Sequence, residues 1–163
     1  MFHRKNWIAV IIVLLGLGIF IPVAQAQRQE HELNFCFVQT ANVVHSSPEV
    51  TITGFDGKGI IQSTHSNKLF DNFTFHFVGT AKVVDGKMSG HALSKNMGPD
   101  GDFIVWEIFN DSVSGLTAKP IYGTGKWKGI KGESKGKVIT AGKPIVQGTS
   151  QLCQKWVGWT EVP

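Results

Sequence analysis

The chain has 163 residues and carries 16 basic against 12 acidic side chains, a formal net charge of +4. This length suits one domain. Without Arg4 and Lys5, both in the first 26 residues, the excess falls to about +2. A general nucleic-acid binder normally carries a stronger basic field. We therefore expect no nucleic-acid partner.

Residues 1–26 have the layout of a secretory signal. A basic start precedes an apolar run at 7–21, Pro22 breaks that run, and Ala24-Gln25-Ala26 is a cleavage pattern. The alternative is a retained anchor helix, but the run is shorter than the ~20 residues that span a bilayer. We expect cleavage after Ala26, a single domain at 27–163, a secreted or periplasmic location and no stable membrane insertion afterwards.

After a polar stretch at 27–32, which we expect to fray, apolar and polar residues alternate with the period of β-strands. Asp56-Gly57, Asp85-Gly86 and Asp100-Gly101 predict turns, and Asp85-Gly86 fits a type I′ hairpin. The expected strands are 33–44, 50–53, 59–65, 72–84, 87–95, 102–109, 114–128, 136–140 and 144–161.

The segment 72–84 has the clearest alternation, with three phenylalanines on one face and His76 on the other. Either face could point into the protein. A solvated or hydrogen-bonded His76 is one interpretation, and a proton donor inside a cavity is the other. His91 lies on the expected partner strand, so the hairpin could bring the two histidines together.

Glu107 follows Trp106 in the apolar segment 102–109 and shares a face with Phe103, Val105 and Phe109. If this face is buried, desolvation raises the pKa of the carboxyl, and Glu107 could serve as a general acid in an apolar pocket. The alternatives are an ion pair with a lysine of a neighbouring strand or an outward position.

The stretch 123–136 is rich in glycine and lysine. It lacks the Gly-Lys-Ser/Thr ending of a phosphate-binding loop, and no helix follows it. We predict instead a tight corner, with Trp127 inward and Lys126 and Lys128 on the outer side of an extended strand. A basic patch that touches an anionic lipid or glycan remains possible. Its members would be Lys126, Lys128, Lys131, Lys135 and Lys137.

Two cysteines, Cys36 and Cys153, lie near the two ends of the strand-rich region. In an exported chain an even pair predicts a disulfide, and the alternative is two buried thiols. The bond would close a loop of more than a hundred residues. In the chain-entropy model this closure stabilises the folded state by roughly 4–5 kcal/mol. Without histidines at ligand spacing the cysteines do not make a zinc site. We expect no metal and no cofactor.

About eight strands at regular spacing, with no helical periodicity after residue 26, predict an all-β sandwich or barrel. A disulfide between the first and last strands favours a closed antiparallel barrel, because closure places those strands side by side. Closure also removes exposed sheet edges.

Two motifs carry a family resemblance: Asp-Phe-Ile-Val-Trp-Glu at 102–107 and Gly-Thr-Gly-Lys-Trp-Lys-Gly-Ile-Lys-Gly at 123–132. The chain resembles the allene oxide cyclase-like barrel group, which includes plant allene oxide cyclases, dirigent proteins and small bacterial proteins. The resemblance implies a calycin-like barrel of eight antiparallel strands with an apolar cavity, in an exported bacterial member and often in an oligomer. It carries no activity over, because fold alone does not define function.

The expected function is binding of a small apolar molecule in the barrel. A cyclase or isomerase that uses Glu107 or His76 is the alternative, and a structural or interaction protein with a side-chain-filled barrel is a third possibility. The expected ligand contacts are Phe73, Phe75, Phe77, His76, His91, Trp106 and Glu107.

Overall fold

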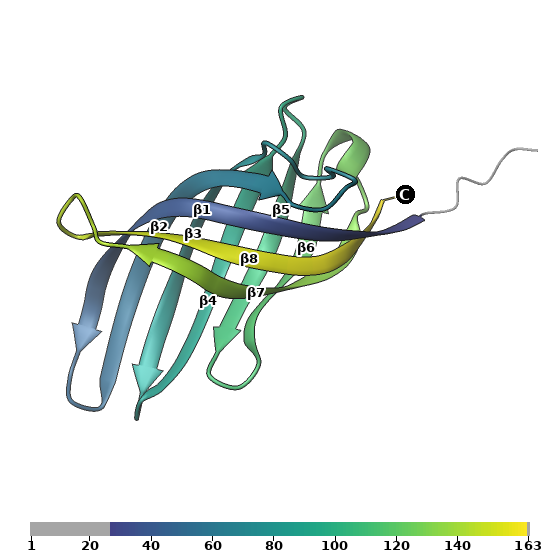
Figure 1. Cartoon of the computed structure of the whole chain (residues 1–163). Coiled ribbons are helices and arrows are strands. Elements are labelled where there is room, and N and C mark those ends of the chain that lie inside the picture. The colour runs from purple at the N-terminus through teal and green to yellow at the C-terminus, as the bar shows by residue number, and fades with distance from the viewer. Residues whose placement is uncertain (1–26, 163) are drawn as a thin grey trace, which may run out of the picture.

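The computed structural model describes residues 27–162, which form one closed antiparallel barrel (Figure 1). The strands follow one another around the wall in sequence order, and the last pairs with the first. The elements are β1 (Gln27–Ser46), β2 (Val50–Ser63), β3 (Thr74–Val84), β4 (Lys87–Met97), β5 (Phe103–Asp111), β6 (Gly115–Gly123), the 3-10 turn η1 (Gly125–Trp127), β7 (Lys131–Gly142) and β8 (Thr149–Val162). The predicted all-β closed barrel of eight strands is confirmed.

The expected signal sequence and its cleavage site lie outside the described residues. Within 27–162, no helix is long and apolar enough to cross a bilayer. The stretch 27–32, expected to fray, is instead the start of β1, where it pairs with β8 from Gln27 opposite Val162 onward. That expectation was wrong because pairing with β8 satisfies backbone groups that the local sequence leaves open.

β3 shows how alternation builds the core. Phe75 and Phe77 are buried, whereas His76 and Val78 between and beyond them are exposed. Successive side chains of a strand point to opposite faces, so the phenylalanine face is the interior of the barrel. The three phenylalanine rings nearest to Phe77 come from β1, β2 and β3, since Phe37, Phe55 and Phe75 pack against it.

Glycines opposite the large rings let the wall accommodate them. A Cβ at Gly57 of β2 would overlap the Phe77 ring, and one at Gly136 of β7 would lie 2.6 Å from the Trp156 ring. β2 continues without interruption through Asp56-Gly57, so the predicted turn there is wrong. The glycine serves close approach of a ring rather than a reversal of the chain.

The predicted hairpin at Asp85-Gly86 is confirmed. Asp85 has φ 49° and Gly86 has φ 75°, as a type I′ turn requires. The turn joins β3 to β4, which pair in register from Val84 opposite Lys87 to Thr74 opposite Met97.

The two ends of the barrel differ in their connections. At one end, here the open end, the strands are joined by residues 47–49, 85–86, 112–114 and 143–148. The opposite end, here the closed end, carries the connections 64–73, 98–102 and 124–130, of which 64–73 is the longest in the described chain. Figure 1 shows these three segments together at one end of the barrel.

The stretch 123–136 forms a corner at the closed end. Trp127 is 3% exposed, as predicted, and its backbone N–H donates to Thr124 O at 2.8 Å. The chain is not extended there, however, because η1 occupies Gly125–Trp127 and Gly125 has φ 48°. Lys126 and Lys128 are exposed on either side of the buried indole.

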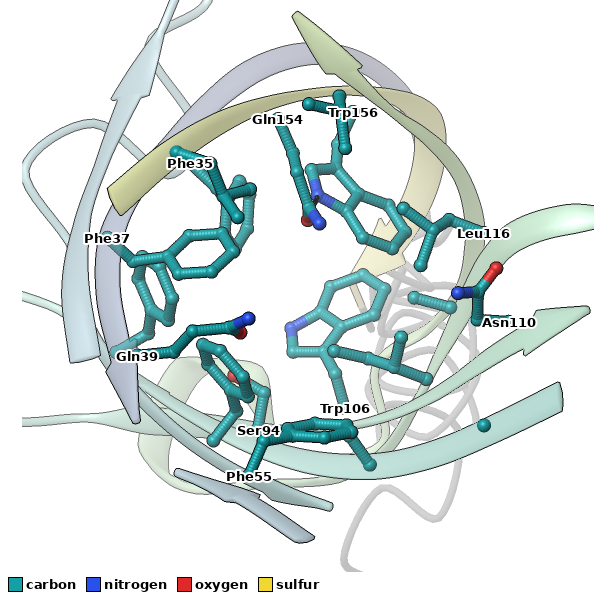
Figure 2. A pocket seen from close by; sticks show the side chains of 18 of the residues that line it. Phe35, Phe37, Gln39, Phe55, Ser94, Trp106, Asn110, Leu116, Gln154 and Trp156 are labelled. Carbon is teal, nitrogen blue, oxygen red and sulfur yellow. Dashed lines mark hydrogen bonds between the residues drawn. The ribbon is translucent and has the colours of Figure 1, made fainter. Parts of the chain in front are cut away.

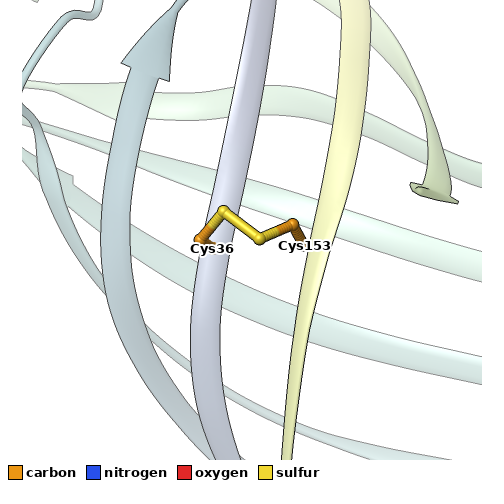
Figure 3. Close-up of a disulfide and its surroundings, with 2 residues drawn as sticks. All are labelled: Cys36 and Cys153. Atoms are coloured by element: carbon orange, nitrogen blue, oxygen red, sulfur yellow. A yellow bond between two sulfur atoms is a disulfide. The ribbon is translucent and has the colours of Figure 1, made fainter. Parts of the chain in front are cut away.

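The predicted disulfide is confirmed. Cys36 of β1 bonds Cys153 of β8, and the two residues are direct partners in the strand register (Figure 3). The bond therefore fastens the seam at which the first strand meets the last. A disulfide is compatible with an oxidising compartment.

Candidate ligand-binding cavity

The barrel encloses a cavity of about 380 Å³ along its axis. Ligand pockets commonly fall in the range of roughly 300–1,000 Å³. Figure 2 shows the aromatic and aliphatic side chains that point into this space from the surrounding strands. The barrel is therefore not filled by its own side chains.

The wall of the cavity has two chemically different sides. On one side β1, β2 and β3 present an aromatic surface that consists of Phe35, Phe37, Phe55, Phe75 and Phe77. On the other side the strands from β4 onward contribute smaller residues and two indoles. Those residues include Gly90, Ala92, Ser94, Asn96, Trp106, Ala118, Ser134 and Trp156. A flat apolar molecule would find ring faces on one side and room on the other.

Some polar groups of the wall are paired with one another, whereas others, such as the Gln39 amide, have no side-chain hydrogen bond among the described residues. Ser94 Oγ donates to Asn96 Oδ1 at 2.6 Å, and Trp156 Nε1 donates to Gln154 Oε1 at 3.0 Å. No lysine, arginine, aspartate or glutamate of the described chain lines the cavity. An ionic group inside would be desolvated without a charged partner, at a high cost in free energy.

His31 of β1 lies at the closed end of the cavity and is 1% exposed. Its Nε2 is 2.7 Å from Ser134 Oγ of β7, a buried hydrogen bond. Its ring packs edge-on against Phe70 and Trp106, with centroids 5.3 and 6.4 Å away. Its Nδ1 is buried and has no hydrogen-bond partner among the described residues.

Burial of His31 lowers the pKa of its imidazole from 6.5 to about 4. The neighbouring Glu30 charge acts in the opposite direction and raises this pKa, whereas His65 lowers it further. Burial has the largest effect, because it penalises the charged form of the ring. The imidazole is therefore neutral at neutral pH.

The two ends of the cavity differ in access. Around His31 the side chains of the wall are buried: Ile61 is 1% and Phe70 is 2% exposed. At the open end Met88 and Val138 line the cavity and are 45% and 55% exposed. The cavity is therefore accessible at the open end and closed at the His31 end.

The structure places four of the expected contacts at the cavity wall: Phe75, Phe77, His91 and Trp106. Phe73 is buried but does not belong to the lining. It packs against Phe70 and Trp127, with ring centroids 5.6 and 5.8 Å away, and helps to seal the closed end.

Glu107 lies on the outer face of β5 and not in the cavity. Its two carboxylate oxygens are each 3.1 Å from a partner, one from Lys119 Nζ and the other from His91 Nε2. The hydrogen bond from Lys119, supported by that from His91, lowers the pKa of the carboxyl below its usual value. The interpretation of Glu107 as a general acid with a raised pKa is therefore wrong, and the alternative of an outward carboxylate paired with a lysine of a neighbouring strand is confirmed. Phe103, Val105 and Phe109 share this outer face with Glu107. His91 borders the cavity wall, but its ring faces Glu107 and Phe109.

His76 also lies on the outer face, where its Nε2 is 2.8 Å from Asp56 Oδ2. The β3–β4 register pairs His76 with Lys95 and His91 with Thr80, so the hairpin does not bring the two histidines together. Neither His76 nor Glu107 can reach a guest in the barrel, because each strand turns its alternate residues outward.

All five lysines of the expected basic patch are exposed, namely Lys126, Lys128, Lys131, Lys135 and Lys137. Lys126 Nζ is 2.7 Å from Asp100 Oδ2, so part of the positive charge is compensated locally. In the part of the chain that the structure describes, no cluster of three or more His, Cys, Asp or Glu side chains is arranged to hold a metal.

The most informative site residue absent from the sequence prediction is His31. It was missed because 27–32 was expected to fray. The alternation His31, Leu33, Phe35, Phe37 continues the inward face of β1 without a break. Extending the period of the strand by one residue pair toward the N-terminus would have found it.

A second, shallow depression lies on the outer face of the barrel, around the disulfide. It includes Val38, Ile60 and Thr140 beside Cys36 and Cys153. Unlike the axial cavity, it is open to solvent along the strands, since Ile60 and Thr140 are exposed.

No family model and no curated protein matches the sequence. Among solved structures, the barrel is similar to the pterocarpan synthase dirigent protein GePTS1, with a TM-score of 0.51 and 12% sequence identity over 85% of this chain and 93% of that one. The pterocarpan synthase dirigent protein PsPTS1 has a TM-score of 0.49 and 12% identity over 85% and 97% of the two chains. At this identity the likeness to GePTS1 shows the fold alone. The resemblance to dirigent proteins expected from the sequence is thus confirmed as one of fold.

Proposed function

We propose that the protein binds a small, neutral, largely apolar molecule inside its barrel. The observation that carries the proposal is the axial cavity of about 380 Å³ with no charged side chain in its described lining. An apolar guest gains roughly 25 cal/mol per Å² of surface that it removes from water. An anion or cation would lose its hydration without compensation.

The disulfide supports an exported protein, secreted or periplasmic, because such bonds persist in oxidising compartments. The fold likeness to a pterocarpan synthase dirigent protein is compatible with a small-molecule guest. A cyclase or isomerase that relies on Glu107 or His76 finds no support, since both side chains are on the outer face. The cavity also argues against a barrel that serves only as a filled structural block.

Two substitutions on β4 test the proposal. Ala92 lines the cavity and is 5% exposed, whereas its neighbour Leu93 faces outward and is 42% exposed. Ala92→Phe fills the cavity, and we expect it to weaken the binding of 2-methylnaphthalene at least about tenfold, because the buried area is lost. Leu93→Phe adds a ring of the same kind on the other side of the strand and should leave binding unchanged.

Binding is measured by titration of the purified protein and followed by tryptophan fluorescence, since Trp106 and Trp156 line the cavity. Circular dichroism confirms that both variants keep the β-sheet signal. Equal affinity of Ala92→Phe and the unmodified protein would contradict binding in the barrel. Failure of 2-methylnaphthalene and of naphthols to bind the unmodified protein at their solubility limits would also contradict it.

A further inference from the structure

The closed end of the cavity differs from the rest of its wall because it holds a buried polar atom that the protein leaves unpaired. Of the described residues, three have buried side-chain polar atoms without a hydrogen-bond partner, and His31 is the one that also lines the cavity. The remaining two are Trp127 and Thr160. An unpaired buried group loses its hydration and gains nothing in return.

The orientation of the His31 ring is fixed from several sides. Ser134 holds Nε2 at 2.7 Å, and Phe70 and Trp106 pack against the ring at an interplanar angle of 81°. The position of the second nitrogen is therefore fixed before binding, without the loss of side-chain freedom that a mobile donor or acceptor undergoes on binding.

We propose that His31 recognises one hydroxyl or carbonyl group of the guest, so that the ligand is an apolar molecule with a neutral polar end that binds deepest in the barrel. This inference rests on the proposed function and predicts the orientation of the bound molecule in the cavity. Its apolar body lies along the phenylalanines of β1, β2 and β3, and its polar end meets Nδ1.

The chemistry of the polar end follows from the hydrogen bond to Ser134. If Nε2–H donates to Ser134 Oγ, Nδ1 is an acceptor and takes a hydroxyl. If Ser134 Oγ–H donates to Nε2, Nδ1 carries the proton and donates to a carbonyl. In both cases the ring is neutral, and no cation of the lining is present to hold a carboxylate or phosphate.

Three probes of similar shape separate these cases: 2-methylnaphthalene, 2-naphthol and 2-naphthaldehyde. We expect either the naphthol or the naphthaldehyde to bind the unmodified protein about 3- to 10-fold more tightly than 2-methylnaphthalene, the range of one buried hydrogen bond. In His31→Phe this preference should disappear, while 2-methylnaphthalene still binds. A gain for the naphthaldehyde identifies Nδ1 as a donor, because an aldehyde oxygen only accepts. A gain for the naphthol with none for the naphthaldehyde identifies Nδ1 as an acceptor, because the naphthol alone can donate.

A measurement on the unmodified protein keeps the test independent of the folding of the variant. Nitrogen-15 spectra of the histidine rings should show a shift of the His31 Nδ1 signal when the preferred probe binds, and no shift with 2-methylnaphthalene. The outer ring of His76 serves as the internal control, since it lies away from the cavity.

The outcomes separate this inference from the proposed function. If all three probes bind equally well, or if His31→Phe retains the preference, the role of His31 is refuted and the cavity remains a binding site. An unchanged Nδ1 signal in the bound state also refutes it. If none of the probes binds, the proposed function itself fails.

Discussion

The two ends of the barrel are built from the same kinds of residue and differ in what covers them. At the closed end Phe70, Phe73 and Trp127 are 2–4% exposed. At the open end Val44, Val113 and Ile145 are 70%, 98% and 85% exposed. The apolar side chains of the closed end form a seal, whereas those of the open end are exposed to solvent. The cavity therefore has one sealed end and one exposed end.

The connection 64–73 accounts for much of the cover at the closed end. The closed-end connection 64–73 is long enough to fold back, and it is held by backbone hydrogen bonds from Ile61 N to Phe73 O (2.8 Å) and from Asn72 N to Ile61 O (3.0 Å). The same segment carries Phe70 into the core. The turn at Asp85-Gly86 of the open end has two residues and cannot cover anything.

The largest expected effect is on stability: an apolar substitution at the closed end should lower the free energy of unfolding much more than one at the open end. Phe70→Ala removes a ring that contacts His31, Phe73, Trp106 and Trp127. We expect a loss of about 3–5 kcal/mol in the free energy of unfolding, the usual range for a buried phenylalanine. Ile145→Ala at the open end should change it by less than about 0.5 kcal/mol.

Urea denaturation of both variants at one pH, with the disulfide intact, gives the two values. Similar losses for Phe70→Ala and Ile145→Ala would mean that the closed end is not a packed seal and would remove the contrast between the ends.

A smaller effect concerns pH. The pKa of His31 is about 4 in the folded protein and ordinarily 6.5, so the unfolded chain binds a proton in this interval and the folded one does not. This contribution to stability is complete above pH 6.5 and is lost as the pH falls toward 4. We expect His31 to account for about 2 kcal/mol of the stability lost between pH 7 and pH 5.

The measurement is the difference in urea midpoint between pH 7 and pH 5, compared between the unmodified protein and His31→Phe. The comparison isolates His31, because the carboxylates Glu32 and Glu107, whose pKa values are also lowered, are present in both proteins. Ile145→Ala should keep the slope of the unmodified protein. An equal slope in His31→Phe would show that the buried imidazole does not remain neutral.

The fold was predictable from particular residues. Alternation at Phe73, Phe75 and Phe77 predicted a strand with two different faces, Asp85-Gly86 predicted a hairpin, and the cysteine pair indicated which strands meet. These signals are local or covalent. The turn predicted at Asp56-Gly57 failed because a glycine that makes room for a ring and a glycine that reverses the chain look alike in sequence.

The site was less predictable, because it depends on which face of each strand is inside. Glu107 lies between Trp106 and Ile108, which line the cavity, but its own side chain is on the outer face, where Lys119 and His91 pair with it. In the sequence, His31 belongs to the polar stretch 27–32. Pairing of β1 with β8 places it in the interior. Both placements depend on the closure of the barrel, which brings residues distant in sequence together.

The most direct test of the central claim locates a bound molecule. Intermolecular nuclear Overhauser effects are recorded from 2-methylnaphthalene to the labelled protein. The cavity predicts contacts to Phe55, Phe77 and Trp106, which line the axis of the barrel and not the outer depression. Contacts instead to Val38 and Ile60, in the outer depression beside the disulfide, would contradict the claim.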